Sequence, residues 1–501
     1  MTTVLTPLSN PPQPDPSSED MTALLDAQRA AHLLEGIPDL ETRLDRVDRF
    51  ALAILEHAEE IAAAINADFG MRNETLSLAI DVSMVISEVE ELRANLADWL
   101  RAREVPGSAE IGMPTFIQVR PKGVVGVIGP WNFPVALIAS PTLEALGAGN
   151  RVMIKISEIP HRTADVVAKA VASRMSPEEV VVVRGDARTS AAFSALQFDH
   201  IFFTGSPQVG AHVAKAAGGN LVPVTLELGG KNPVVVGTDA DVAVAAQRVS
   251  ETLLFNGGQN CLSPDYVFVP RDKVDDFVTA FETNVRGIFP TYAENPGAVS
   301  IVNDRNYARV TALIDDAELK GASVIRILPA DEAAMLPDPA GRRIPVTLIL
   351  NATEDMEITR EEIFGPVIVV WPYDEVSQPV TYINSHPSPL GAYWFGNDGE
   401  DFQEFLDKTT SGGVTRNDLQ LHAQIPGAPA GGIGRSGMGA YTGKVGFDTF
   451  SHLRTVTTSE LPVSAASRGL PPNVGDEATA MLSGIIEQVR GAIAARVERE
   501  A

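Results

Sequence analysis

The chain has 501 residues, of which 45% are hydrophobic and 21% charged, a balance typical of folded soluble enzymes and not of disordered or multispan membrane proteins. A single core stops growing at roughly 250 to 300 residues, so two or three domains are expected. The formal net charge of -26 repels phosphate backbones and anionic lipid surfaces, which argues against nucleic acid as a partner.

Residues 1–20 are predicted to form a disordered arm, because they combine prolines, serines and aspartates without an apolar run. The same stretch lacks the basic and apolar segments of a secretory signal. Cys261 is the only cysteine, so no internal disulfide can form and nothing indicates an oxidising compartment. We therefore expect a cytoplasmic protein.

Helices are predicted from about Met21 to Leu100, where apolar residues recur at spacings of three and four. After Pro106, β-branched runs broken by glycine alternate with helical segments. The expected strands lie near 123–128, 151–155, 180–184 and 200–203, and the expected helices near 136–147 and 163–173. Strands that alternate with helices indicate a parallel sheet.

The longest uncharged stretch, residues 123–143, has the length of a membrane span. Pro130, Asn132, Pro134 and Pro141 interrupt it, which favours a buried strand followed by a turn. We expect no stable membrane insertion.

A second alternating block begins near Val234 and continues to about residue 410, which suggests a second α/β domain. Its first elements are expected near 241–254, 266–269 and 272–286. The glycine-rich and aromatic segment 435–454 is expected to pack against another part of the assembly. The tail from about 476 to 501 is predicted to be an amphipathic helix that docks on its own subunit or on a partner.

The segment 202–210 reads FFTGSPQVG, an apolar strand that ends in glycine and is followed by a serine able to cap the next helix. The free N–H groups and positive dipole of such a helix start suit a dinucleotide pyrophosphate. The segment lacks the GxGxxG pattern, so an ordinary strand-to-helix turn is the alternative interpretation.

Lys155 ends a predicted strand and Glu158 follows three residues later. Ligands of parallel sheets bind at the carboxyl ends of their strands, so this pair could hold a ribose. A surface ion pair is the competing interpretation.

Three further residues are candidates for catalysis. Cys261 follows two glycines among polar neighbours, which suggests an exposed turn and a reactive thiol, although a free cysteine can also be inert core. Glu227 is a carboxylate in an apolar strand, either a base with a raised pKa or half of a salt bridge. Asn132 lies between two prolines, either as a positioned amide donor or as a satisfied turn residue. No histidine spacing indicates a metal site.

Taken together, the segments resemble the aldehyde dehydrogenase superfamily over residues 20 to 460, and the final segment resembles its class 3 branch, in particular the bacterial coniferyl aldehyde dehydrogenases. The motifs that carry the resemblance are PWNFP at 130–134, KISE at 155–158, FTGS at 203–206, LELGGK at 226–231, GQNC at 258–261, EEIFGP at 361–366 and SGMGAYTGKVGFDTFSH at 436–452. SPDY at 263–266 and SIVNDRNYARV at 300–310 resemble the bacterial coniferyl aldehyde dehydrogenases in particular.

The resemblance implies a role for each matching residue. Cys261 would be the nucleophile, Glu227 the general base and Asn132 half of an oxyanion hole, with Glu362 a second candidate for the base. The implied cofactor-binding residues, which would bind NAD or NADP, are Trp131, Lys155, Glu158, Gly205, Ser206, Gly229, Glu362 and Phe364.

The resemblance also implies an α/β fold with a Rossmann-like parallel-sheet cofactor domain, a second α/β catalytic domain and a small oligomerisation element. We expect a homodimer or a dimer-based oligomer. The expected layout begins with a disordered arm at 1–20 and a cofactor domain at 21–228, in which 107–121 is part of an oligomerisation hairpin. A catalytic domain at 229–411 follows, then a return to the cofactor domain with the oligomerisation element at 412–460, and a tail at 461–501.

The predicted function is NAD(P)-dependent oxidation of an aldehyde to its carboxylic acid through a thioester on Cys261. An aromatic aldehyde of the coniferyl type, or a medium- to long-chain aldehyde, is the expected substrate. Two alternatives stay open: transfer of the acyl group to coenzyme A, and a catalytically silent binding protein on the same fold. Because Glu158 would repel a 2′-phosphate, the sequence favours NAD over NADP.

Overall fold

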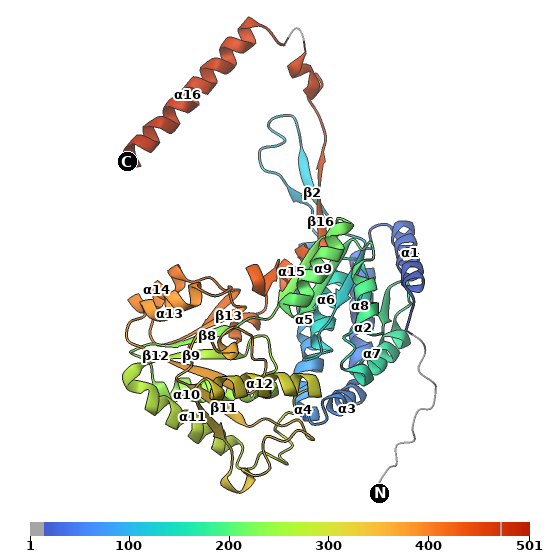
Figure 1. Ribbon diagram of the computed structural model, residues 1–501. Helices are drawn as coiled ribbons and strands as arrows, with labels where there is room; N and C mark the ends of the chain where they lie inside the picture. The colour runs from blue at the N-terminus through green and yellow to red at the C-terminus, as the bar shows by residue number, and fades with distance from the viewer. Residues whose placement is uncertain (1–14, 471–472, 501) are drawn as a thin grey trace. The chain divides into compact units, whose positions relative to one another are not determined.

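The computed structural model describes residues 15–470 and 473–500 (Figure 1). The chain divides into two compact units. The first comprises the chain up to Leu100 together with Arg120–His452, and the second comprises Arg101–Val119 and the chain from Leu453 onward. The first unit contains two separate sheets, and all the predicted site residues belong to it.

The first helix, α1 (Ser18–Glu35), begins inside the stretch that the sequence predicted as a disordered arm. Its start is fixed by a capping box, in which the Asp20 N–H donates to Ser17 Oγ and the Ser17 N–H donates to the Asp20 carboxylate. The arm prediction therefore placed the start of the helix too late, and its residues 1–14 lie outside the described part of the chain. Further helices, as predicted, occupy this region: α2 (Leu40–Glu56), α3 (Ala58–Phe69) and α5 (Ser83–Trp99).

The first sheet has the strand order β15-β7-β6-β3-β4-β5 and is parallel except for β15. It confirms the parallel sheet expected from the alternating pattern. The strands are β3 (Val124–Ile128), β4 (Arg151–Lys155), β5 (Val180–Val183), β6 (His200–Gly205), β7 (Val224–Leu228) and β15 (Gly437–Met438). The stretch suspected of spanning a membrane forms β3, a turn and the buried helix α6 (Ala136–Gly147).

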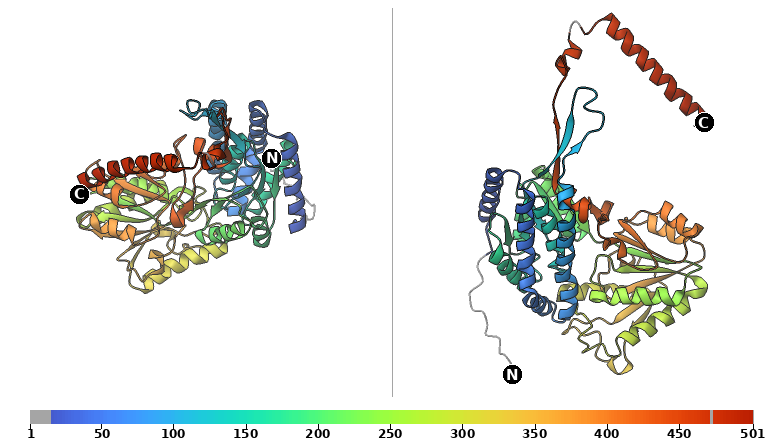
Figure 2. Two further views of the ribbon diagram at one scale, coloured as in Figure 1. Left: turned by 90° about the horizontal axis from the view of Figure 1, so that it is seen from above. Right: turned by 180° about the vertical axis from the view of Figure 1, so that it is seen from behind.

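Helices cover both faces of this sheet. On one face, α1, α8 (Ala187–Ser194) and α9 (Pro207–Gly219) pack on β3, β4, β6 and β7 around a core that includes Met21, Leu25 and Phe193. On the other face, α6 and α7 (His161–Arg174) pack against the strands, and α2, α3 and α5 pack on these two helices. Figure 2 shows this helical layer from behind.

The second sheet has the order β10-β11-β12-β9-β8-β13-β14, with all neighbours parallel except β10 and β11. Its strands are β8 (Asn232–Val236), β9 (Pro264–Pro270), β10 (Ser323–Ile327), β11 (Val346–Leu350), β12 (Val367–Tyr373), β13 (Gly391–Phe395) and β14 (Gly413–Arg416). The sheet begins just after the boundary expected at 228/229, and it extends past the expected end at 411 because β14 pairs with β13.

Helices also cover both faces of the second sheet. One face is covered by α10 (Val242–Leu254) and α11 (Val274–Ile288). The other is covered by α12 (Asp304–Leu319), α13 (Ser377–Asn384) and α14 (Glu400–Lys408). The two faces have separate apolar cores, as a helix–sheet–helix layering requires.

The second unit contains a three-stranded sheet of β1 (Arg103–Glu104), β2 (Thr115–Pro121) and β16 (Ser451–Thr457). Its tail is the helix α16 (Asp476–Glu500), which confirms the predicted element. The apolar stripe of α16, represented by Met481, Ile486 and Val497, is more than half exposed. Its docking partner stays a prediction. In the described part of the chain, no helix has the length and apolar character needed to cross a membrane.

Candidate active site

Two sheet edges supply the candidate site. The strands β3, β4, β6 and β7 are parallel neighbours, so the residues that follow them emerge at one edge of the first sheet. That edge carries Trp131, Lys155, Gly205 and Gly229, as the rule for parallel sheets predicts. The other contributors precede strands of the second sheet: Cys261 lies before β9, and Glu362 lies before β12, its parallel neighbour.

Lys155 is fully buried at the end of β4. Its ammonium donates to the backbone oxygens of Ile156 at 2.6 Å and Gly185 at 2.8 Å. Burial lowers the pKa of Lys155, and the negative charge of Glu158 opposes that shift. The predicted surface ion pair is wrong, because the lysine is buried and its hydrogen bonds go to carbonyl groups.

The segment after β6 forms a capped helix start, as the sequence predicted. Ser206 Oγ accepts from the Val209 N–H at 3.3 Å, and Pro207 begins α9. Gly205 lies so close to the Phe203 ring that a Cβ would collide with it. Small residues and free N–H groups at this helix start leave room for an anionic group.

The turn after β3 is held by a buried ion pair that the sequence analysis did not identify. Arg72 and Asp81 are both fully buried and lie 2.6 Å apart. Arg72 also donates to the Asn132 backbone oxygen at 2.6 Å, while Asp81 accepts from the N–H groups of Val135 and Ala136 at the start of α6. The pair therefore fixes the backbone within the PWNFP turn and directly after it.

The Asn132 side chain is buried and its amide donates to the Gln259 backbone oxygen at 3.2 Å. This contact brings the turn after β3 next to the segment 255–262, which we call the cysteine loop. Asn132 is therefore directed toward the residues that carry the thiol, as a side-chain oxyanion donor would have to be.

Buried amide side chains hold the cysteine loop. The Gln259 amide donates to Asn256 O and Ser300 O, both at 3.1 Å, and accepts from the Val302 N–H at 2.9 Å. Asn256 and the following glycine adopt positive φ of 52° and 61°, a region that asparagine and glycine enter at low cost. The prediction of an exposed turn was wrong, because this network lets the polar residues of the loop be buried.

Cys261, like Leu262, is a partly exposed residue, whereas residues 256–260 of the loop are buried. Sγ lies 3.7 Å from Asn260 Oδ1. Burial raises the pKa of the Cys261 thiol to about 12, and the negative charges of Glu362 and Glu227 add to the shift. The thiol therefore lies in the negative field of both carboxylates, and attack by sulfur requires a proton acceptor.

Glu227 is buried near the end of β7, next to Leu228. Burial raises the pKa of Glu227 well above the ordinary value. Its Oε1 has no hydrogen-bond partner among the described residues, and no described cation forms an ion pair with it. The salt-bridge interpretation therefore has no support, and the carboxylate has the character of a base.

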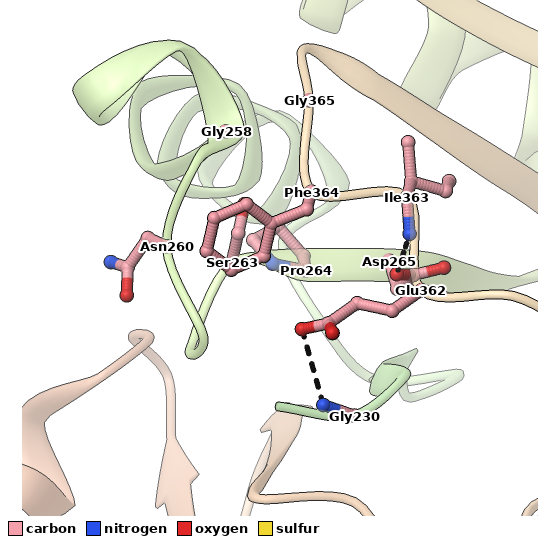
Figure 3. Close-up of a pocket in the computed structure, with 10 residues that line it drawn as sticks. All are labelled: Gly230, Gly258, Asn260, Ser263, Pro264, Asp265, Glu362, Ile363, Phe364 and Gly365. Atoms are coloured by element: carbon pink, nitrogen blue, oxygen red, sulfur yellow. Dashed lines mark hydrogen bonds between the residues drawn. The ribbon is translucent and has the colours of Figure 1, made fainter. Parts of the chain in front are cut away.

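Residues 358–366, which we call the Glu362 loop, bring a second carboxylate to the site (Figure 3). Glu362 accepts from the Gly230 N–H at 3.1 Å, and a Cβ on Gly229 would collide with the carboxylate. Burial raises the pKa of Glu362 to about 8. Phe364 has a φ of 49°, and its ring meets Trp131 edge-on with centroids 5.2 Å apart.

Three charged residues that the sequence analysis did not assign fix the Glu362 loop. The Ile363 N–H donates to the buried Asp265 carboxylate at 2.9 Å, as Figure 3 shows. Lys231 forms an ion pair with Asp265 and donates to the Ile358 and Glu361 oxygens. Arg309 donates to the backbone oxygens of Glu362 at 3.0 Å and Ile363 at 2.7 Å.

All three residues lie inside segments that carried the family resemblance, so their position within motifs was the available signal. Lys231 ends LELGGK, Asp265 lies in SPDY and Arg309 lies in SIVNDRNYARV. No cluster of three or more potential metal ligands occurs in residues 15–470 and 473–500. The site thus combines a thiol, two carboxylates of raised pKa and an amide donor, the groups needed for acyl chemistry on sulfur.

Comparison with known sequences identifies the family of the chain. Residues 14–456 match the aldehyde dehydrogenase family, and the chain therefore belongs to that family of enzymes. It is 43% identical to a Caulobacter vibrioides protein described as "Probable coniferyl aldehyde dehydrogenase", over 93% of this chain and 97% of that one. It is 40% identical to the coniferyl aldehyde dehydrogenase of a Pseudomonas species, over 94% and 97% of the two chains.

A solved structure supports the same assignment. The substrate-bound AldH of Staphylococcus aureus superposes with a TM-score of 0.85 at 30% sequence identity, covering 92% of this chain and 98% of that one. The α/β fold with parallel-sheet domains is thus that of the aldehyde dehydrogenases, as the sequence predicted, and NAD(P) is the general cofactor of such enzymes.

Proposed function

We propose that the chain oxidises an aldehyde to the carboxylic acid through a covalent thioester on Cys261, with an aromatic aldehyde of the coniferyl type as the substrate. The observation that carries the proposal is that the only thiol of the chain lies on a loop that the Asn132 amide contacts. The raised pKa values of two buried carboxylates, Glu227 and Glu362, whose charges act on this thiol, support the proposal. The two coniferyl aldehyde dehydrogenase relatives support the substrate class.

The residues at the edge of the first sheet fit a nicotinamide dinucleotide. Lys155 would hold the adenosine ribose together with Glu158, and the start of α9 at Ser206 would receive the pyrophosphate. The wall at the nicotinamide end would be formed by Glu362, Trp131 and Phe364. Because Gly205 and Gly229 have no side chains, the dinucleotide could approach their backbone. When bound, the dinucleotide supplies the acceptor for the hydride that leaves the substrate carbon.

The first step is addition of Cys261 sulfur to the aldehyde carbon. Because the thiol pKa is raised to about 12, a neighbouring carboxylate accepts its proton as the C–S bond forms. The negative charge that develops on the aldehyde oxygen is stabilised by the Asn132 amide and the Cys261 backbone N–H. Loss of hydride from the carbon then leaves a thioester on Cys261.

The second step is hydrolysis of that thioester. Glu227 accepts a proton from water as its oxygen attacks the acyl carbon, and collapse of the adduct releases the carboxylic acid and regenerates the Cys261 sulfur. The buried, unpartnered carboxylate of Glu227 suits this role, because its raised pKa makes it a stronger base than an exposed glutamate. Glu362 is the second candidate for the same proton transfer.

We further propose that the enzyme works as a cytoplasmic homodimer and uses NAD in preference to NADP. The mass of the purified protein by light scattering tests the dimer, since a monomeric mass at micromolar concentration would contradict it. Figure 1 shows the β2–β16 sheet of the second unit, the segment that we assign to oligomerisation.

The reaction is tested by following absorbance of the reduced nicotinamide with coniferyl aldehyde, benzaldehyde or hexanal, with NAD or NADP, and without coenzyme A. We expect reduction with coniferyl aldehyde as the preferred substrate, and no reduction by Cys261→Ala. Reduction that requires coenzyme A would instead indicate transfer of the acyl group to that thiol. Normal turnover by Cys261→Ala would overturn the thioester mechanism.

A further inference from the structure

We infer that Asp15, which lies before the first helix, is a specificity-determining residue that disfavours a 2′-phosphate at the adenosine-ribose position and so selects NAD over NADP. The inference rests on the proposed dinucleotide site at Lys155. It adds a residue from the N-terminal segment to a site otherwise made from the strand ends of the first sheet.

The contacts that bring Asp15 to this site pass through one loop. Gly185 and Asp186 follow β5, the neighbour of β4 in the sheet. The Gly185 oxygen accepts from the Lys155 ammonium at 2.8 Å, and the Asp186 N–H donates to Asp15 Oδ2 at 3.2 Å. Adjacent residues of the same loop thus touch the buried lysine and the Asp15 carboxylate.

The position of Asp15 is set by a well-anchored helix. Ser17 caps α1 through the box with Asp20, and Met21 and Leu25 of the same helix are buried in the core on the first sheet. α1 also packs on α8, which begins directly after Asp186 (Figure 1). The packing of α1, which begins soon after Asp15, therefore helps to hold the Asp15 carboxylate at the Asp186 loop.

The electrostatic balance around Lys155 is negative. The pKa of Lys155 is lowered by burial, and three carboxylates counteract that shift by their charge: Glu158, Asp15 and Asp186. Asp15 and Glu158 are exposed and Asp186 is partly exposed. Three negative charges around one ammonium leave a surplus that repels a 2′-phosphate, whose own charge is about -2 at neutral pH.

The two arginines that flank Gly185 and Asp186 in the sequence are already engaged with carboxylates. Arg188 lies 3.0 Å from Asp186, and Arg184 pairs with Asp165. Sites that accept NADP commonly present an arginine to the 2′-phosphate. Here a phosphate would have to compete with these carboxylates for either guanidinium.

The test is equilibrium binding of NAD+ and NADP+, measured by calorimetry without aldehyde on the full chain. Asp15→Asn removes the charge and keeps an oxygen that can accept from the Asp186 N–H. Glu19→Gln is the matched control, because Glu19 is an exposed carboxylate in the first turn of the same helix and does not act on Lys155.

We expect wild type to bind NAD+ more tightly than NADP+. In Asp15→Asn, the Kd for NADP+ divided by the Kd for NAD+ should fall by about threefold at low salt. The change should shrink at about 1 M salt, where the Debye length is about 3 Å. Glu19→Gln should leave the ratio unchanged. Adenosine 2′,5′-bisphosphate and AMP, used as probes in place of the dinucleotides, should show the same shift.

An unchanged ratio in Asp15→Asn, in a protein that still binds NAD+, would overturn this inference and leave the proposed cofactor site intact. Equal tightening of both dinucleotides would also overturn it, because Asp15 would then act on a part that they share. Failure of wild type to bind either dinucleotide would refute the proposed cofactor use, and this inference with it.

Discussion

The cysteine loop and the Glu362 loop meet at one site but are held by different kinds of interaction. Uncharged amides of Asn132, Asn256 and Gln259 fix the cysteine loop through hydrogen bonds to backbone atoms. Ionised side chains fix the Glu362 loop: Lys231, Asp265 and Arg309. The loops touch where Gly258 approaches the backbone of Gly365 so closely that a Cβ would collide.

The difference shows how one site can hold the reacting sulfur in a fixed position while the groups beside it gain and lose protons. Amide side chains keep their hydrogen bonds at every pH in the working range, so the position of the thiol is insensitive to proton transfers beside it. A loop held by charged groups responds to changes in ionisation, because each buried ion depends on its partner. We therefore expect changes near the cysteine loop to alter the chemical step, and changes near the Glu362 loop to alter cofactor binding.

The largest effect is expected for Glu227→Gln. Removing the base should lower steady-state turnover by about 1,000-fold, because the thioester forms but is hydrolysed slowly. Stopped-flow absorbance should still show a burst of about one reduced nicotinamide per Cys261, as an accumulating acyl-enzyme requires. Loss of the burst together with turnover would instead assign Glu227 to the first step.

The second-largest effect is expected for Asn132→Ala. Loss of an oxyanion donor should lower kcat/KM by about 100-fold. Because Asn132 is one of the amides that fix the cysteine loop, the change should affect the chemical step. The Kd for NAD+ should therefore stay within about twofold of wild type. Calorimetry on the same preparation measures that constant. A large loss of NAD+ affinity would break the proposed division between the two loops.

Arg309→Met is expected to weaken cofactor binding, because Arg309 is one of the residues that fix the Glu362 loop. It leaves the Glu362 and Ile363 oxygens without their charged donor, and the Kd for NAD+ should rise by about tenfold. The matched control is Arg305→Met, an exposed arginine earlier in the same helix. If Arg309 positions the Glu362 loop, kcat should fall less than the affinity for NAD+. General misfolding would instead lower the fraction of active sites and leave the NAD+ affinity of the remaining sites unchanged.

The smallest effect is a pH dependence of stability from Glu362. Burial raises its folded pKa from 4.5 to about 8, so the folded state favours the protonated form. The stabilisation from this group is complete below about pH 4.5 and is lost as pH rises through 8. Glu362→Gln should therefore raise Tm at pH 9 by about 2 °C or more relative to wild type, with little change at pH 5. Parallel curves for the two proteins at all pH values would contradict the assignment.

The sequence predicted most of the parallel-sheet architecture, because alternation of apolar strands and amphipathic helices is a local property. The rule for carboxyl edges of parallel sheets indicated Lys155 and Glu158 as site candidates, and the capped helix start indicated Gly205 and Ser206. Trp131 and Gly229 were indicated only by the family resemblance. Cys261 and Glu362 do not obey the rule for carboxyl edges, because they precede strands of the other sheet. Glu362 was indicated only by the motifs, whereas Cys261 was also indicated by the glycines and polar residues around it.

Contacts between distant residues were not predictable from one sequence. Arg309 reaches a loop 53 residues away, and Asp15 meets Asp186 across 171 residues. The burial of the cysteine loop was missed for a related reason. Polar residues there indicate an exposed turn until the backbone partners at Ser300 and Val302, about 40 residues further along, are known.

Cys261 is the only sulfhydryl in the chain, and this has a practical consequence. Any reagent that modifies thiols on the native protein must react at the proposed catalytic centre, so incorporation of label counts competent centres directly. An aldehyde that forms the thioester should shield that sulfur from alkylation. The number of thiols labelled per chain therefore measures the active fraction of the protein, because no second thiol contributes to the count.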